Sequence, residues 1–195
     1  MDLIDLQKRL SFIRAAEQLK NVLRSAHTSA GRHESTAEHT WRLCLLAMAF
    51  EDRLGGLDFA RLLKICVIHD LGEAFGGDVP AVERQTVPDK PERERRDLLR
   101  LLAPLSPRQQ GEFLALWEEY ENAATPEALA VKALDKIETI IQHNQGVNPA
   151  DFDYGFNLSY GQAYTSASPL FTAIRTLVDE ETRRRDSGEA VVTAD

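Results

Sequence analysis

The most apolar stretch of this chain reads Leu62-Leu63-Lys64-Ile65-Cys66-Val67-Ile68-His69-Asp70. Its apolar residues cover nearly every side of a helix, so we expect a helix from about Asp58 to Gly76-Gly77 that is the most buried in the fold. The stretch ends on a histidine and an aspartate. A buried carboxylate is costly unless it is paired or holds a metal ion, so this end of the helix is a candidate site.

Helical spacing continues on both sides of this stretch. An amphipathic helix with one bend is predicted over residues 3–24. Ser35-Thr36-Ala37-Glu38 has the spacing of a capping box, which begins a helix that ends at Gly55-Gly56. Downstream helices are expected to open at Pro91, Ser106-Pro107, Thr125-Pro126 and Ser168-Pro169.

The segments between these helices are predicted as loops or short turns, over residues 25–34, 78–90 and 144–168. No strand of any length is expected. The fold class is therefore all-α, a single-domain helical bundle. Trp41 and Trp117 are expected to be core anchors rather than platforms for stacking bases.

Composition narrows the class of partner. The chain has 195 residues, the size of one domain, with 43% hydrophobic and 28% charged residues. The net charge of −8 and the absence of a dense basic run argue against a nucleic-acid polymer or an anionic membrane as partner. There is no apolar run of the roughly 20 residues that span a membrane, nor a signal peptide at the start. We therefore expect a cytoplasmic protein whose Cys44 and Cys66 are reduced core thiols.

Four chemically active residues do not fit a pure packing role. They are His39 in the first turn of a helix, the His69-Asp70 pair, and Asp135 in the middle of another helix. Two neutral imidazoles and two carboxylates make a mixed nitrogen and oxygen site suited to a divalent transition metal. Two anions also offset the charge of such an ion.

The order of these residues resembles the HD-domain superfamily of metal-dependent phosphohydrolases, in the branch that contains the 5′-deoxynucleotidases. The motifs that carry the resemblance are Glu34-Ser35-Thr36-Ala37-Glu38-His39, Ile68-His69-Asp70-Leu71-Gly72-Glu73, Gly77-Asp78 and Lys132-Ala133-Leu134-Asp135-Lys136. The resemblance implies an HD-type bundle over residues 1–184, with a metal-site core of about 35–143. Residues 185–195 are expected to form a frayed tail.

The resemblance also assigns roles. It implies that the metal ligands are His39, His69, Asp70 and Asp135. Glu73 matches a carboxylate beside a metal-bound water, and Asp78 matches an acid that contacts the substrate or assists the leaving group. Both are therefore expected to be catalytic, and Asp78 also to bind substrate.

Phosphate binding by an acidic protein needs a local cation. Arg24 matches a phosphate-binding arginine of similar proteins, and Arg24 and Arg32 flank the loop before the first metal ligand, so both are expected to bind substrate. Lys132 and Lys136 bracket Asp135 and are further candidates. Ser25 stands where bacterial deoxynucleotidases have a tryptophan that helps to exclude a 2′-hydroxyl, so the resemblance sets no preference between deoxy and ribo substrates.

The histidine count favours a single metal ion. The five histidines are His27, His33, His39, His69 and His143, and none lies between Asp70 and Asp135, where HD proteins with two or more metals generally have further histidines. We expect one divalent ion, chosen from Mn, Co, Fe, Ni, Zn and Mg. His143 is two turns past Asp135 and could reach the same cleft.

These features favour a metal-dependent 5′-nucleotidase that hydrolyses (deoxy)nucleoside 5′-monophosphates to nucleoside and phosphate. Two alternatives stay open. One is a hydrolase of a nucleotide pyrophosphate or triphosphate bond, and the other is a non-catalytic metal- or nucleotide-binding protein on the same scaffold. The resemblance implies two partners: a small phosphorylated substrate, a nucleotide, and a second copy of the chain in a homodimer.

Overall fold

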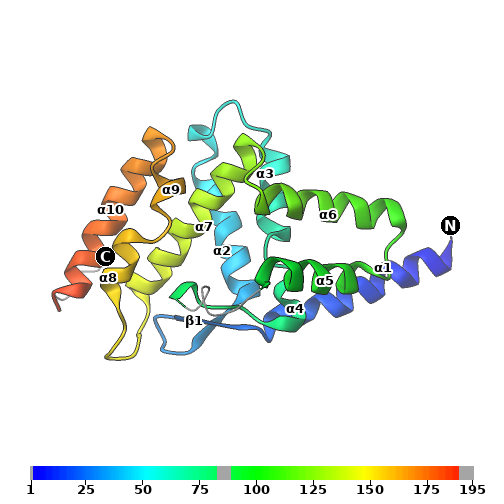
Figure 1. The fold of residues 1–195 in the computed structure, drawn as a ribbon, viewed down its shortest axis with the longest axis horizontal. Helices are drawn as coiled ribbons and strands as arrows, with labels where there is room; N and C mark the ends of the chain where they lie inside the picture. The colour runs from blue at the N-terminus through cyan, green and yellow to red at the C-terminus, as the bar shows by residue number, and fades with distance from the viewer. Residues whose placement is uncertain (1, 83–88, 189–195) are drawn as a thin grey trace.

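The computed structural model describes residues 2–82 and 89–188 (Figure 1). Its helices are α1 (Leu3–Ala16), α2 (Thr36–Ala49), α3 (Phe59–Ile68), α4 (Glu73–Gly76), α5 (Lys90–Leu102), α6 (Pro107–Glu121), α7 (Pro126–Gln145), α8 (Tyr154–Ser159), α9 (Gln162–Thr165) and α10 (Pro169–Asp186). Two 3₁₀ helices, η1 (Glu17–Lys20) and η2 (Glu51–Arg53), and two strands, β1 (Leu23–His27) and β2 (His33–Ser35), complete the described elements. The prediction of a mostly helical fold is confirmed.

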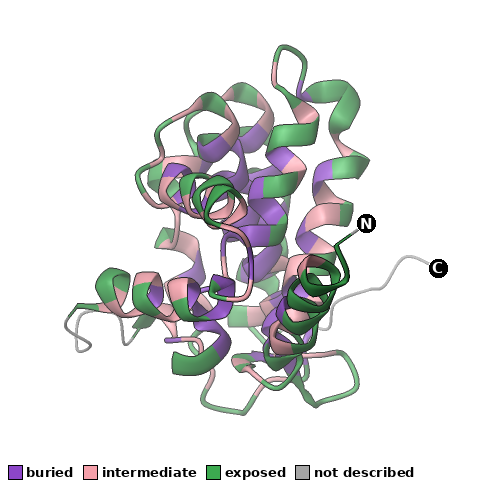
Figure 2. Ribbon diagram, turned by 90° about the vertical axis from the view of Figure 1, so that its right-hand side faces the viewer, coloured by how far each residue is buried: buried purple, intermediate pink, exposed green. Residues whose placement is uncertain are grey.

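Helix α7 is the central element of the bundle. It packs against α2 and α3 on one side and against α8, α9 and α10 on the other (Figure 1). Large buried side chains such as Leu43, Leu62 and Leu134 join α2, α3 and α7 in one core. Figure 2 shows this buried interior between helices whose outer faces are exposed. Polar residues on α7 are consequently deep in the molecule.

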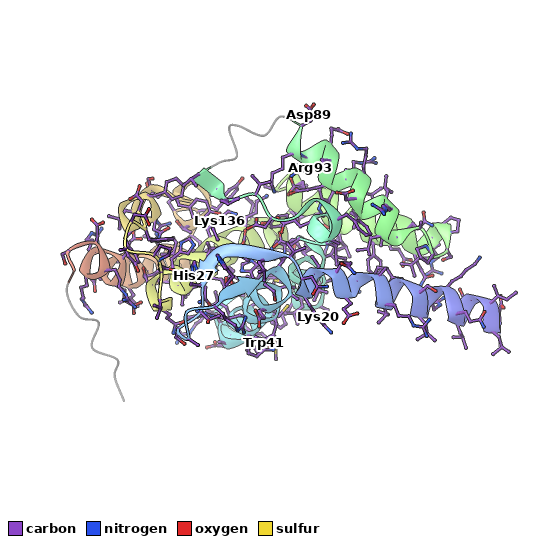
Figure 3. All side chains as sticks on the ribbon, turned by 90° about the horizontal axis from the view of Figure 1, so that it is seen from below. Lys20, His27, Trp41, Asp89, Arg93 and Lys136 are labelled. Atoms are coloured by element: carbon purple, nitrogen blue, oxygen red, sulfur yellow. The ribbon has the colours of Figure 1, made fainter. Side chains whose placement is uncertain are left out.

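A second, smaller core joins α1, α5 and α6. Trp117 is only 3% exposed there, so its prediction as a core anchor is confirmed. The same prediction for Trp41 is wrong, because its side chain is 61% exposed and lies at an outer edge of the molecule in Figure 3. A single apolar residue on an amphipathic helix does not reveal which face the tertiary fold will cover.

Residues 25–34, predicted as a loop, belong largely to a hairpin. Strand β1 pairs antiparallel with β2, with Leu23 opposite Ser35 and His27 opposite His33. The helical prediction for residues 3–24 therefore holds only as far as η1. Strands this short are below the length at which alternation becomes visible, which explains why the sequence did not reveal them. The hairpin carries Arg24 on one strand and leads directly into α2 from the other.

The helix predicted to run from Asp58 to Gly76-Gly77 is interrupted. Helix α3 ends at Ile68 and α4 begins at Glu73. Between them the backbone tightens into i→i+3 hydrogen bonds, from the Leu71 amide to the Ile68 carbonyl (3.0 Å) and from the Glu73 amide to the Asp70 carbonyl (3.0 Å). A Cβ at Gly72 would lie 2.7 Å from the Glu94 carbonyl oxygen, so only glycine lets α5 approach this turn.

Other local predictions are confirmed. Ser35 and Glu38 form the capping box at the start of α2, and α6, α7 and α10 begin at the expected prolines. Both cysteines are free thiols, with Cys66 buried and Cys44 partly buried. Helix α10 runs to Asp186, past the predicted boundary at 184, while the expectations for residues 83–88 and 189–195 lie outside the described residues. Among the helices of the described ranges, none combines the length and apolar character needed to cross a membrane.

Candidate active site

His39 is held at the buried start of α2. The capping box fixes the first turn of this helix, and the His39 side chain is completely buried. Its Nδ1 contacts a carboxylate oxygen of Glu138 on α7. An N–H at Nδ1 donating to that carboxylate leaves the lone pair of Nε2 facing the other way, as in histidines that bind metals.

His69 and Asp70 follow the end of α3. The N–H at Nδ1 of His69 donates to the backbone carbonyl of Cys66 at 2.7 Å, which again leaves the Nε2 lone pair available. The His69 Nε2 lies 3.1 Å from Oδ2 of Asp70. The potential ligand atoms of His39, His69 and Asp70 all lie within 4.8 Å of one another, so the three can share one ion.

Asp135 reaches the same point from α7. Its Oδ1 lies 3.1 Å from Nε2 of His39. Its Oδ2 accepts hydrogen bonds from the Tyr120 hydroxyl at 2.7 Å and from Lys136 Nζ at 2.6 Å. One oxygen is therefore fixed by neighbours while the other faces the imidazole. The structure thus brings together all four residues that the sequence predicts as metal ligands.

The chemistry of these donors fits a divalent cation. The Nε2 atoms of His39 and His69 are buried and have no hydrogen-bond partner among the described residues. Burial and Arg24 act to lower the pKa of His39, yet the carboxylates of Glu138 and Asp135 raise it to about 10. The surroundings therefore favour positive charge at a point where two imidazole lone pairs converge.

The two aspartates are held in the ionised form that a metal requires. Burial alone would raise the pKa of Asp70, but the imidazoles of His69 and His39 outweigh it and hold that pKa below the usual value. For Asp135, the effect of burial is outweighed by Lys136 and His39, which hold its pKa well below the usual value.

His69, Asp70 and Asp135 line a cleft of about 370 Å³, and His39 is buried next to Asp135. Its lining combines groups from separate elements: Arg24, His69, Asp70, Glu73, Asp78, Lys90, Lys132, Asp135, Lys136, Thr139, His143, Phe156, Tyr160 and Tyr164 among others. The volume is in the range of small-molecule sites. His143 thus reaches the cleft as the sequence suggests, with its Nδ1 3.0 Å from Oδ1 of Asn157.

Arg24 enters the cleft from β1. Its Nη1 lies 3.6 Å from Oδ2 of Asp70, its Nε lies 3.4 Å from Oε2 of Glu34, and its Nη2 donates to Thr139 Oγ1 at 3.1 Å. Burial acts to lower the pKa of Arg24, but the carboxylates of Asp78 and Asp70 raise it above the usual value. Ser25, the next residue on the strand, is exposed and does not line the cleft.

Glu73 and Asp78 both line the cleft, as do His69, Asp70 and Asp135. Glu73 is 4% exposed, with its carboxylate 3.4 Å from the Thr36 hydroxyl and 3.7 Å from Lys90 Nζ. Burial, reinforced by the charges of Asp70 and Asp78, raises the pKa of Glu73 well above its usual value. A raised pKa suits a carboxylate that takes up a proton at neutral pH.

Arg32 lies apart from the other predicted substrate-binding residues. Its guanidinium forms a two-point ion pair with Glu38, at 2.5 and 2.8 Å, and its side chain is 61% exposed. Arg32 does not line the cleft. It lies in the hairpin turn, where the nearby Glu38 at the start of α2 holds it on the outer surface.

Several residues of the site were missed by sequence reasoning. Glu138 carries the same signal as Asp135, an acid inside an apolar helix one turn later, and could have been found. Tyr120 and Lys90 gave no such signal, because a tyrosine or lysine on an amphipathic helix is ordinary. The aromatic residues of α8 and α9 were hidden in a segment predicted as a long loop.

Known proteins resemble this chain over most of its length. A family model described as the HD domain matches residues 16–175. The 5′-deoxynucleotidase HDDC2 of Danio rerio is 30% identical over 142 residues, which is 72% of this chain and 70% of that protein. The 5′-deoxynucleotidase hdd1 of Schizosaccharomyces pombe is 34% identical over 137 residues, 67% of this chain and 68% of that protein.

A solved structure has the same architecture. The crystal structure of a predicted metal-dependent phosphohydrolase from Magnetospirillum magnetotacticum superimposes with a TM-score of 0.77 and 29% sequence identity. The match covers 93% of this chain and 97% of that one.

Proposed function

The chain belongs to the HD domain family of phosphohydrolases, and we propose that it is a metal-dependent 5′-nucleotidase acting on (deoxy)nucleoside 5′-monophosphates. The observation that carries this proposal is that three candidate metal ligands, a largely buried arginine and a buried glutamate line a single cleft, with the fourth candidate ligand, His39, buried next to Asp135. The 5′-deoxynucleotidases related to the chain support the choice of a phosphomonoester of a nucleoside as substrate.

His39, His69, Asp70 and Asp135 would hold one divalent cation. Such an ion polarises a phosphate oxygen and makes a water molecule acidic enough to attack phosphorus at neutral pH. The Nδ1 contacts of His39 with Glu138 and of His69 with the Cys66 carbonyl fix both imidazoles in the orientation that binding requires.

The remaining residues act on the substrate and on protons. Arg24 binds the phosphate, since a guanidinium matches two phosphate oxygens and this one already faces Asp70. Glu73 takes the proton of the attacking water. Asp78 contacts the sugar or the leaving oxygen. The water oxygen bonds to phosphorus as the P–O ester bond breaks, and the leaving oxygen takes up the proton that the water gave up and departs as the hydroxyl of the nucleoside.

Substrate and metal are tested together. The purified protein is incubated with nucleoside mono-, di- and triphosphates, deoxy and ribo, under Mn²⁺, Co²⁺, Zn²⁺ and Mg²⁺ in turn, and the products are identified. We expect inorganic phosphate and nucleoside from the monophosphates. Release of pyrophosphate or triphosphate would instead indicate the alternative hydrolase, and tight nucleotide binding without turnover would indicate a non-catalytic protein.

We further propose that two copies pair through α1. Four apolar side chains of this helix are exposed: Leu3 by 69%, Leu6 by 38%, Leu10 by 52% and Ile13 by 63%. Their spacing is that of a helix–helix seam, which a second copy of α1 would cover. Sedimentation of the intact protein and of Leu10→Glu tests this: a dimer that the substitution converts to a monomer is expected, and a wild-type monomer would contradict it.

A further inference from the structure

Part of the cleft is aromatic. Phe156, Tyr160 and Tyr164, on α8, after α8 and on α9, all line it and are named here the aromatic wall. The rings of Phe156 and Tyr160 stack with centroids 5.6 Å apart and planes 28° from parallel. All three side chains are only partly buried, so their surfaces are available to a ligand.

Lys136 lies between the aromatic wall and the candidate metal site. Lys136 Nζ lies 2.6 Å from Oδ2 of Asp135 and 5.3 Å from the centre of the Tyr160 ring. Lys132 is placed similarly, with its Nζ 5.6 Å from the centre of the Tyr164 ring. In Figure 3 Lys136 lies in the middle of the molecule, away from the surface positions of Trp41 and Asp89. A ligand whose phosphate sits by Arg24 and the metal ligands would therefore have its other end near these rings.

The aromatic wall is fixed in place from behind. Arg175 on α10 is 5% exposed and its guanidinium donates to the backbone carbonyls of Asn157 and Tyr160, each at 2.6 Å. Its Nε donates to Asp179 at 2.6 Å, which balances the buried charge. By donating to these main-chain carbonyls, the guanidinium orders the segment of α8 and α9, which has little regular structure of its own.

A glycine allows this segment to pack closely against α7. Gly161 has φ of +71°, and a Cβ there would lie 2.6 Å from Cβ and Cγ of Lys136. Only glycine allows both that backbone conformation and that approach. The rings are consequently held in a set position before any ligand arrives, which reduces the entropy lost on binding.

We propose that the aromatic wall is the subsite for the nucleobase of the substrate, an inference that rests on the proposed function. Aromatic side chains bind the flat faces of bases by stacking, and every base has such a face. A sugar phosphate without a base offers nothing planar to these rings. The presence of a base would therefore affect the affinity of the site for a ligand more than the identity of the base does.

The test compares two variants of Tyr160 on two kinds of substrate. Tyr160→Leu removes the aromatic face, while Tyr160→Phe is the matched control that keeps it and removes only the hydroxyl. With the metal-loaded protein, Tyr160→Leu should raise KM for AMP and dAMP roughly tenfold, the size of one lost stacking contact. Its KM for ribose 5-phosphate and the kcat values should not change, and Tyr160→Phe should resemble the wild type on every substrate.

The outcomes separate the subsite from the activity. If the variants change KM for ribose 5-phosphate and AMP equally, or change neither, the aromatic wall does not bind the base, although the nucleotidase proposal stands. Binding of adenosine, followed by calorimetric titration, gives a readout that needs no turnover. If no monophosphate is hydrolysed but adenosine binds and Tyr160→Leu weakens that binding, the proposed function fails and the base subsite stands. Thermal unfolding of each variant verifies that the fold is retained, and equal adenosine binding by wild type and Tyr160→Leu would overturn the inference.

Discussion

Two groups of residues that line the cleft are built in different ways. The charged group, Arg24, His69, Asp70, Glu73 and Asp135, comes from a strand, the turn after α3, the start of α4 and the long buried helix α7. The aromatic wall comes from α8, α9 and Tyr160 between them, a segment ordered by Arg175 and Gly161 rather than by helix length. A cleft of this kind can keep its chemistry constant while the wall that meets the rest of the substrate changes.

The difference predicts that substitution of Glu73 in the charged group changes kcat, whereas substitutions in the aromatic wall change KM. The largest expected effect is on the kcat of a Glu73 variant. Glu73→Gln keeps the volume but removes the proton acceptor, so we expect kcat to fall by roughly 10²–10⁴-fold. The KM for AMP should stay close to that of the wild type, in contrast to Tyr160→Leu. Steady-state kinetics on both variants checks this. A Glu73→Gln enzyme with an unchanged kcat would remove Glu73 from the chemistry.

Glu138 should affect the metal without touching the substrate. It is 1% exposed and contacts Nδ1 of His39, so Glu138→Gln loses the charged acceptor that orients the imidazole. We expect metal affinity to fall roughly 10–100-fold. Competition with a chelating dye measures it. Glu38→Gln is the matched control, because Glu38 precedes His39 in the sequence but pairs with Arg32 on the surface. Equal affinities in the two variants would contradict the orienting role.

Substitutions of Arg24 and Arg32 should have different effects on KM, although the sequence predicts the same substrate-binding role for both. Arg24→Gln removes a buried cation from the phosphate end of the cleft, and we expect KM for AMP and ribose 5-phosphate to rise together by about tenfold, the size of a charge-assisted hydrogen bond. Arg32→Gln should leave both KM values unchanged, since its guanidinium faces Glu38 outside the cleft. An effect confined to AMP in Arg24→Gln would place this arginine at the base rather than the phosphate.

His143 should contribute to pH-dependent stability rather than to turnover. Burial lowers its pKa to about 4, although the contact with Asn157 acts in the opposite direction. The unfolded chain, with a histidine pKa near 6.5, binds the proton first, so this stability is complete above about pH 6.5 and is lost as the pH falls toward 4. Between pH 7.5 and 5 the loss is about 2 kcal/mol. Urea unfolding of His143→Gln at both pH values should show a smaller decrease than the wild type, and an identical decrease would exclude His143 as the cause.

Residues of the candidate site could be predicted from the sequence where a polar or charged residue interrupts an apolar helical pattern. His69-Asp70 and Asp135 were recognisable because charges interrupt apolar helical runs, and burial of such charges demands a partner. Local spacing could not reveal the break before Glu73, because it depends on the approach of α5 to Gly72. The separate fates of Arg24 and Arg32 depend on a hairpin too short to leave a pattern.

The aromatic wall was invisible for a different reason. Residues 144–168 have the Gly, Asn, Tyr and Ser content of a loop, and their order depends on contacts with Arg175 and α7 that are distant in the sequence. Propensity describes what a segment does alone, whereas this segment is fixed by its neighbours. The part of the cleft that we propose as the base subsite is therefore the part that could not be predicted from the sequence.

Metal analysis of the purified protein tests the central claim most directly. After loading with Mn²⁺ and removal of excess ion, wild type should retain one divalent ion per chain by mass spectrometry of its metal content, and Asp70→Asn should retain almost none while its circular dichroism stays helical. A wild type that binds no ion, or an Asp70→Asn variant that retains as much as the wild type, would show that His39, His69, Asp70 and Asp135 do not form the site.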